Sequence, residues 1–423
     1  MKEDFLHYLW RFQKLGALPL QASSGAEVVV VFPGVMNSGG GPDFLNAKIW
    51  IDDTLWAGDV EIHLRASSWF GHQHHLDSNY DAVILHVVWE DDQALCYPSG
   101  RAVPCLVLGN SLDPEHWERY QKKFITLPHW IPCEKMIASF PEFKWSHWKE
   151  RLYLQRLEEK TLQIRKLLKT NYNNWEQTLF ELLAKNFGLN RNGDVFLQWA
   201  QRLPFAVVQK NCANGDLLEA LFMGMAGLLN GEIHHPYPQK LRKDFDYLKR
   251  KYGFNEVSGI SVNFGRLRPP NFPTIRLSQL AQLYHQHPRP FSRLIKAEAP
   301  QDLNWIRTIG VSEYWKTHYT FEKESAPSPK RLSQSFFDLL MINTLIPLRF
   351  AYAQIQEGSF GEELFRWIRS PPAEKNRITQ GFSDLGLPFQ SALDSQSLLQ
   401  LKKDYCDKKK CLHCAVGFHL FDN

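Results

Sequence analysis

The chain has 423 residues, of which 44% are hydrophobic and 22% charged, so it is long enough for two or three domains with their own cores, and its composition excludes disordered and collagen-like proteins. Its formal net charge of +4 hides an asymmetry: residues 1–110 contain six basic and thirteen acidic residues, a net −7, and the remainder carries +11. An acidic part joined to a basic part is expected of a metal-binding centre beside a phosphate-binding surface, or of helices whose solvated faces are rich in Lys.

The first part of the chain shows strand patterns behind one helix. Helical spacing of apolar residues predicts a helix over residues 3–15. Strands are expected over residues 27–32, 48–51, 54–64 and 82–89, with a partly helical segment over 67–80 and an edge strand over 103–108. A right-handed crossover would lay the strand over 82–89 parallel beside the strand over 54–64.

From about residue 112 the pattern changes to helices, which are expected over residues 148–169, 175–187, 217–229, 240–252 and 334–355. The last of these is the most apolar, but it contains Asp338, Pro347 and Arg349. We therefore expect a buried helix and no membrane span. The sequence thus predicts an α/β domain over residues 1–111, followed by a mostly α-helical region over residues 112–423.

Ionisable residues gather on one strand of the predicted α/β domain. Asp43 follows a tight Gly-Pro turn at the start of a strand, and Glu61 and His63 lie eighteen and twenty residues later. Side chains at i and i+2 of a strand share a face, so Asp59, Glu61 and His63 point one way, opposite an apolar face. Ionisable groups on a packed strand are costly unless they bind something, which makes this a candidate site.

Further histidines follow this strand. The segment 72–77, His-Gln-His-His-Leu-Asp, can ligate a metal or can be the exposed polar start of a helix. We prefer the second interpretation for His75 and leave both open for His72, His74 and Asp77. His86 lies near this segment in the predicted sheet, and it either joins such a metal site or is a hydrogen-bonded core histidine. We expect His7 to lie with Glu3 on a solvated helix face.

The order of these elements, with Asp43 at the start of one strand and Glu61 two residues before a basic residue on the next, is similar to the core of the PD-(D/E)XK nuclease superfamily. This resemblance implies a restriction-endonuclease-like mixed sheet flanked by helices. Separately, the whole chain resembles an uncharacterised bacterial protein family of unknown function. The stretches that carry this second resemblance are residues 5–10, 41–44, 56–63, 83–88, 130–134 and 271–276 and the cysteine-rich tail.

The nuclease resemblance implies that Asp43 and Glu61 bind a divalent cation, Mg or Mn, while a lysine orients the attacking water or stabilises charge on the phosphate. This chain has His63 at the lysine position. Lys48 on the neighbouring strand can supply the missing positive charge. Alternatively, His63 is itself a ligand, which would favour Mn, Fe or Zn over Mg. A third alternative is an inactive site that keeps the fold.

The C-terminal tail predicts a second metal centre. Three of the seven cysteines, Cys406, Cys411 and Cys414, lie in the last eighteen residues. They fit one tetrahedral zinc ion or an iron–sulfur cluster, but need a fourth ligand. His413 and His419 are local candidates, and Cys133 is the preferred distant one. We expect the other cysteines to be core residues: Cys96, Cys105 and Cys212.

The odd cysteine count and the absence of a recognisable signal peptide favour a reducing compartment, and we expect the cytoplasm and no membrane association. The preferred function is a metal-dependent phosphodiester hydrolase that acts on nucleic acid, DNA or RNA. The phosphate-binding residues would lie on one basic helix: Arg242, Lys243, Lys249, Arg250 and Lys251. The alternative is a catalytically inactive binding or scaffold protein that retains a nuclease fold.

Overall fold

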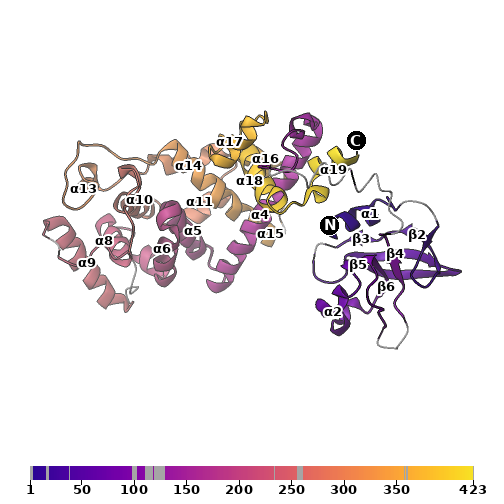
Figure 1. The fold of residues 1–423 in the computed structure, drawn as a ribbon. Coiled ribbons are helices and arrows are strands. Elements are labelled where there is room, and N and C mark those ends of the chain that lie inside the picture. Colours follow the sequence, from indigo (N-terminus) through magenta and orange to yellow (C-terminus); the bar gives the residue numbers. More distant parts are fainter. Residues whose placement is uncertain are drawn as a thin grey trace. The chain divides into compact units, whose positions relative to one another are not determined.

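The computed structural model describes residues 3–15, 19–37, 39–97, 102–109, 118, 129–232, 234–254, 261–356, 358 and 361–422. The chain divides into two compact units (Figure 1). The first unit contains Met1–Trp148, Asp384–Leu387 and Leu401–Asn423, and the second contains Lys149–Ser383 and Pro388–Gln400. The domain boundary expected between residues 111 and 112 lies outside the described residues. The cysteine-rich tail belongs to the first unit, although the sequence assigned it to the helical region.

The first unit is built on a mixed sheet of seven strands. The strands are β1 (Leu20–Gln21), β2 (Glu27–Phe32), β3 (Val35–Met36), β4 (Phe44–Ile51), β5 (Thr54–Arg65), β6 (Val83–Glu90) and β7 (Cys105–Val107). Their order is β1-β2-β4-β5-β6-β7, and β3 pairs with β4. As expected, β6 lies parallel to β5, and β7 adds a further parallel strand beside β6.

The sheet curves until its two ends nearly meet. Ala22, just after β1, forms an antiparallel bridge with Leu106 of β7, and the backbone N–H of Ser23 donates to the carbonyl of Cys105 at 2.7 Å. The mixed sheet was therefore predicted correctly, but it closes into a near-barrel. Closure pairs strand edges that an open sheet leaves free. This pairing joins residues 84 positions apart, so it is not visible in the local pattern.

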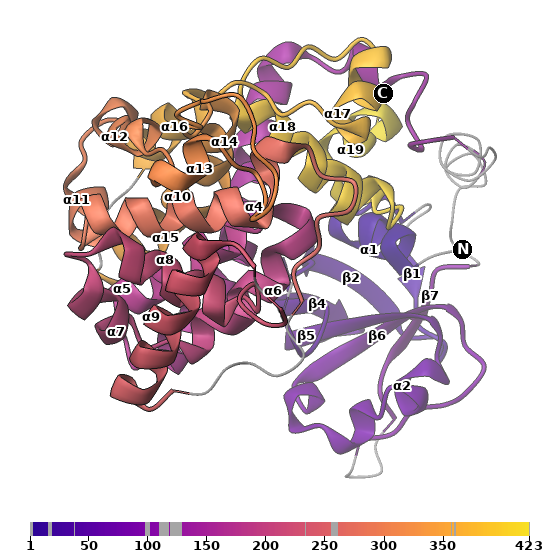
Figure 2. The same ribbon diagram turned by 90° about the vertical axis from the view of Figure 1, so that its left-hand side faces the viewer.

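Helix α1 (Glu3–Arg11) packs against this sheet, and Figures 1 and 2 both draw it beside the strands. Its apolar side chains share one buried cluster with Val60 and Ile62 of β5, whereas Glu61 and His63 point to the opposite face. Between β5 and β6 lie α2 (Ser68–Gly71), η1 (His74–Leu76) and η2 (Ser78–Tyr80). These short helices therefore stand beside the polar face of β5.

Later segments complete the first unit. They are η3 (Ile137–Ser139), the start of α4 (Glu142–Thr170), η7 (Leu401–Cys406), η8 (Cys411–His413) and α19 (Ala415–Asp422). The tail packs on α1, because the ring of Phe421 lies 5.0 Å from that of Tyr8 and 6.4 Å from that of Phe5.

The second unit is helical. After α4 it contains α5 (Trp175–Phe187), α6 (Leu189–Arg202), α7 (Phe205–Asn211), α8 (Gly215–Met225), α9 (Pro236–Tyr252), η4 (Pro269–Asn271), α10 (Pro273–Gln286), α11 (Pro290–Lys296), η5 (Pro300–Leu303), α12 (Trp305–Thr308), α13 (Glu313–Lys316), α14 (Gln334–Leu340), η6 (Met341–Leu345), α15 (Ile346–Ile355), α16 (Gly361–Arg369), α17 (Arg377–Asp384) and α18 (Ala392–Gln400).

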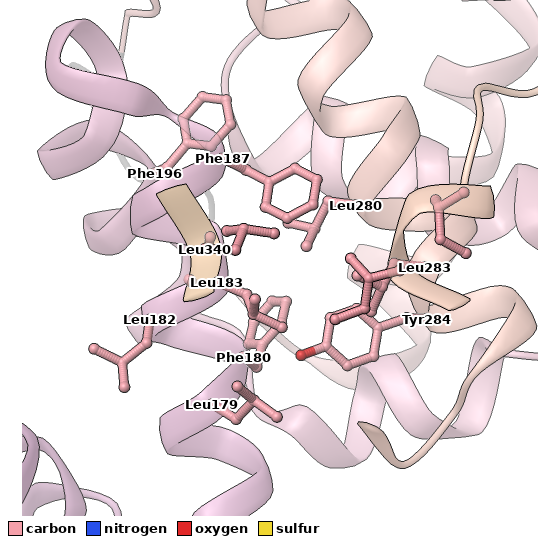
Figure 3. Packing of buried hydrophobic residues seen from close by; sticks show 14 of the residues in the cluster. Leu179, Phe180, Leu182, Leu183, Phe187, Phe196, Leu280, Leu283, Tyr284 and Leu340 are labelled. Carbon is pink, nitrogen blue, oxygen red and sulfur yellow. The ribbon is translucent and has the colours of Figure 1, made fainter. Parts of the chain in front are cut away.

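Figure 3 shows the core of this unit, where Phe180 and Leu183 of α5 meet Leu280 and Tyr284 of α10. The rings of Phe180 and Tyr284 lie 5.5 Å apart. The helical stretch Gln334–Ile355 is apolar and long enough to cross a bilayer, but 72% of its most apolar window is buried inside the unit. This burial agrees with the expected core helix.

Candidate functional site

The two carboxylates of the candidate site lie side by side on neighbouring strands, since Asp43 immediately precedes β4 and Phe44 of β4 pairs with Val60 of β5. The turn before β4 is held by the Asn37 amide, which donates to the carbonyls of Gly40 and Pro42 at 3.1 and 3.0 Å. The backbone N–H of Asp43 donates to Oε2 of Glu61 at 3.1 Å, and Oδ2 of Asp43 accepts from the backbone N–H of Ile62 at 3.0 Å. Each carboxylate is thus fixed by the backbone beside the other.

Helix α1 contributes a histidine that the sequence did not place at the site. Nε2 of His7 lies 3.2 Å from Oδ2 of Asp43, so the expected solvated position of His7 was wrong. Burial alone would lower the pKa of His7, but the close contact with the negatively charged Asp43 raises it. His7 was missed because Asp43 is remote in sequence, and helical spacing alone gave no indication of the contact.

Three histidines meet beside Glu61. One ring nitrogen each of His63, His72 and His74 lies within 4.8 Å of the other two. Nε2 of His63 is 3.1 Å from Nδ1 of His72, and Nε2 of His74 is 3.3 Å from Oε1 of Glu61. Gln73 adopts a left-handed conformation with φ of 63°, which turns the chain sharply between His72 and His74. Two of the three side chains that the sequence left open, those of His72 and His74, therefore join the site.

His86 lies behind this group on β6. It pairs with Glu61 in the parallel register, is fully buried, and its Nε2 lies 2.8 Å from Nδ1 of His63. This contact fixes the orientation of the His63 ring. It agrees with the interpretation of His86 as a hydrogen-bonded core histidine, although its hydrogen-bond partner, His63, belongs to the candidate site. Nδ1 of His86 is buried without a hydrogen-bond partner among the described residues.

Burial controls the charge of the site. It raises the pKa of Glu61 to about 9, and the nearby charge of Asp43 adds to the rise. Burial, together with the neighbouring histidines, lowers the pKa of His63 to about 2. Burial also lowers the pKa of His86 to about 4 and that of His74 below its ordinary value. Neutral imidazoles are the form that binds a metal ion.

Nε2 of His63 and Nδ1 of His72 form a hydrogen bond at 3.1 Å, but the donor atom of His74 has no such partner. Nε2 of His74 is buried and forms no hydrogen bond of acceptable geometry, although Oε1 of Glu61 is only 3.3 Å away. Oε1 of Glu61 also lies 3.5 Å from Nε2 of His63. Short distances with poor hydrogen-bond angles are expected of ligands that converge on an ion. His63, His72, His74 and Glu61 are therefore the residues that can hold a metal.

Other predicted site residues lie apart. Lys48 is exposed and pairs with Ala57, four residues from Glu61 along β5, which is roughly 13 Å of extended chain. The structure thus brings Asp43, Glu61 and His63 together but leaves Lys48 outside. His75 is exposed, as preferred, and Asp77 caps η2 by accepting from the Asn79 backbone N–H.

The five predicted phosphate-binding residues lie on α9 of the second unit: Arg242, Lys243, Lys249, Arg250 and Lys251. Arg242 is engaged in the fold, because its guanidinium donates to the carbonyls of Leu229 and Gly231 at 2.6 Å each. Lys243, Arg250 and Lys251 are exposed. The helix was predicted correctly, and its role in phosphate binding stays a prediction.

The four cysteines of the predicted metal centre all belong to the first unit. Burial, followed by the charges of Cys414 and Cys411, raises the pKa of the Cys133 thiol. Among the described residues, these sulfur atoms are not part of a group of three ligand atoms within 4.8 Å of one another, and the four-cysteine centre stays a prediction. The two local alternatives for the fourth ligand have other partners. His413 Nε2 is 3.3 Å from Oδ1 of Asp4, and His419 Nδ1 is 3.2 Å from Nζ of Lys144.

The remaining cysteines are not uniformly core residues. Cys212 is buried as expected and Cys105 is half-buried, but Cys96 is exposed. The expectation for Cys96 was wrong because the loop after β6 leaves its side chain in solvent.

Comparison with known proteins identifies a family but not an activity. Neither the curated proteins nor the solved structures contain a match to the chain. The resemblance to the nuclease superfamily therefore stays a prediction. The model of the family described as "Protein of unknown function (DUF2851)" matches residues 3–377, and the chain belongs to that family.

Proposed function

We propose that this protein is a metal-dependent hydrolase that cleaves phosphodiester bonds in nucleic acid, with the ion held by His63, His72 and His74. The observation that carries the proposal is the convergence of one nitrogen from each ring within 4.8 Å, directly beside the Glu61 carboxyl group. Three protein ligands leave coordination positions open for water and substrate, as in catalytic metal sites.

The ligand set favours a transition metal. Imidazole nitrogens suit Zn and Mn better than they suit Mg, which prefers oxygen ligands. The Nδ1 atom of His63 faces His86 at 2.8 Å, which leaves Nε2 of His63 for the ion. His86 would thus orient the ligand His63 by contacting Nδ1, the ring nitrogen of His63 that does not bind the ion. Outer partners of metal-bound histidines commonly act in this way.

The carboxylates take different roles in this proposal. A bound ion lowers the pKa of its water and stabilises negative charge on a phosphate. Glu61 lies beside that position, and the positive charge of a bound ion would favour its ionised form over the protonated form that burial favours in the absence of a cation. The ionised carboxylate would accept the proton of the attacking water, or add a fourth ligand. Asp43 is the weaker candidate ligand, because Oδ2 already accepts from Ile62 and lies against His7. Asp43 would position Glu61 through its backbone N–H.

The substrate class rests on the combination of this site with a basic second part of the chain. Residues 111–423 carry the excess of Lys and Arg, and the exposed cations of α9 suit phosphate contacts that do not depend on sequence. The alternative remains a protein that binds metal and nucleic acid without turnover.

Metal binding is tested by thermal denaturation of the purified protein with Zn, Mn or Mg. Zn or Mn at about 100 times the dissociation constant should stabilise the wild type by about 2.7 kcal/mol. His72→Ala should lose this stabilisation, whereas the exposed neighbour variant His75→Ala should keep it. An equal metal response in both variants would exclude the three-histidine site.

Hydrolysis is tested with labelled single- and double-stranded DNA and RNA in the presence of the stabilising metal. Glu61→Gln should lower the cleavage rate by about 10²–10⁴-fold while the circular dichroism spectrum stays unchanged. Metal binding by the wild type without any cleavage would instead support the non-catalytic binding protein.

A further inference from the structure

The second unit contains a cavity of about 320 Å³. Its lining comes from two segments: residues 270–279, around the start of α10, and residues 319–333, which lead into α14. A volume of this size lies at the lower end of the range of small-molecule sites. Neither segment takes part in the hydrolase proposed above, so the cavity needs an explanation of its own.

Arg276, in the first turn of α10, lines the cavity and is only 5% exposed. Its guanidinium lies over the Phe336 ring, 3.7 Å from the ring centre. Nη1 donates to Oε1 of Gln279 at 2.9 Å, and Nη2 donates to Oδ1 of Asn271 at 2.6 Å. Nε is buried and has no hydrogen-bond partner among the described residues. These neutral neighbours therefore fix the plane of the guanidinium and leave one of its donors for a further acceptor.

Lys330 brings a second buried positive charge to the lining, with 8% of its surface exposed. Its Nζ donates to three backbone carbonyls at 2.5, 2.9 and 3.1 Å, those of Trp315, Lys316 and His318. The carbonyl of Lys330 accepts from Nε2 of Gln279 at 2.7 Å. Gln279 therefore contacts both cationic residues and joins the two segments of the lining.

These two charges have no acid to compensate them. The described lining of the cavity contains no Asp or Glu. Burial is the sole cause that lowers the pKa of Arg276 to about 10 and that of Lys330 below its ordinary value, so no carboxylate opposes it. The lining also contains Arg331, whose exposed charge is screened by solvent. Buried cations without a counter-ion are costly, and a bound anion would remove this cost.

The start of α10 adds to the attraction for an anion. This helix is 14 residues long, and its N-cap residue Phe272 offers no side-chain hydrogen bond. The N–H groups of a first turn lack partners within the helix, and the helix dipole places partial positive charge there. Ile275 and Arg276 of this turn both line the cavity. Two buried cations and a helix N-terminus thus meet at one cavity.

We propose that this cavity binds a small organic phosphate, a phosphate monoester whose phosphoryl oxygen accepts from Nε of Arg276. A phosphate monoester carries about −1.5 to −2 charges at pH 7, which matches Arg276 and Lys330 together better than a singly charged carboxylate does. A guanidinium also suits the geometry of phosphoryl oxygens. The organic part of the ligand would fill the remaining volume beside Ile275 and Tyr319. The site is separate from the histidine site and does not depend on the proposed hydrolase.

Binding is tested by isothermal titration calorimetry of the whole chain, with a chelator present so that no ion occupies the histidine site. The probes are phenyl phosphate, benzoate and inorganic phosphate. Phenyl phosphate should bind at one site per chain and about tenfold or more tightly than benzoate, because of its second charge. Inorganic phosphate should compete with it. No saturable binding of phenyl phosphate, or an equal affinity for benzoate, would overturn the proposal.

The position of the site is tested with two variants. Arg276→Gln should weaken the binding of phenyl phosphate by about 10–100-fold, because it removes a charged hydrogen-bond donor. Arg268→Gln, at an exposed position of the same unit, is the matched control and should bind as the wild type does. Equal affinities of the two variants would contradict the assignment.

A crystal of the wild-type chain soaked with phenyl phosphate tests the same position without a variant. The phosphoryl group should lie within hydrogen-bond distance of Nε of Arg276, with the phenyl ring inside the cavity. Phenyl phosphate bound only elsewhere on the chain would overturn the proposal.

Discussion

The buried carboxyl group of Glu219 should make the second unit less stable as the pH rises. Glu219 lies on α8 and has no exposed surface. Its Oε1 accepts from the Tyr237 hydroxyl at 2.6 Å and from Nε1 of Trp315, and its Oε2 accepts from the Ser278 hydroxyl at 2.8 Å. The carboxyl group thus joins three helices other than its own.

The size of the effect follows from proton binding. Burial raises the pKa of Glu219 above its ordinary value of 4.5, and the hydrogen bonds of its donors only partly oppose this rise. Between 4.5 and the folded pKa, the folded chain keeps the proton and the unfolded chain releases it. The free energy of unfolding should therefore fall by about 1.4 kcal/mol per pH unit in this window. The full stabilisation is present below pH 4.5.

The variant Glu219→Gln removes the titration and keeps the shape. Its amide oxygen can still accept from Tyr237 and Trp315, and the Ser278 hydroxyl can turn to accept from the amide. Urea unfolding at increasing pH above 5 should give a wild-type curve that falls relative to the variant curve, with a slope of up to about 1.4 kcal/mol per pH unit until the folded pKa of Glu219 is passed. Glu322→Gln, at an exposed site in the same unit, is the matched control and should follow the wild type. Equal slopes for the wild type and Glu219→Gln would refute the reasoning.

Three further predictions concern single contacts. His63→Lys should abolish the Zn- or Mn-dependent rise in melting temperature, because it removes a proposed ligand that is only 2% exposed; Mg-dependent cleavage at or above the wild-type rate would instead place His63 in the lysine role. Gly224→Ala should lower the free energy of unfolding by about 1–3 kcal/mol, because the added methyl group would overlap the Phe245 ring; an unchanged urea midpoint would contradict this. Asn174→Ala should cost about 1 kcal/mol in the same assay, because the Asn174 side chain caps α5 by accepting from the Gln177 backbone N–H at 3.0 Å, and a cost near zero would show that water replaces the cap.

The local sequence determined the elements and their faces. Alternation along β5 placed Val60 and Ile62 in the core and Glu61 and His63 on the opposite face, as observed. The apolar run over 82–89 predicted a strand parallel to β5, which is β6. Helix periodicity likewise located helices such as α5 and α9. These features depend on residues a few positions apart, so a single sequence is sufficient to predict them.

Only the tertiary structure decided which distant groups meet. His7 reaches Asp43 because α1 packs on the sheet, and His72 and His74 converge because the left-handed Gln73 turns the chain between them. Lys48 shares the face of Glu61 but lies too far along the strand, a separation set by the β4–β5 register.

The near-closure of the sheet and the packing of Trp130 and Trp148 against the tail have the same origin. Both are contacts between segments far apart in the chain, and they form only when packing compensates the entropy of closing a long loop. The residue pattern around Ala22 gives no indication that its partner is Leu106. The sequence by itself therefore determined the local elements and the residue types of both candidate sites, and the fold decided which of those residues stand together.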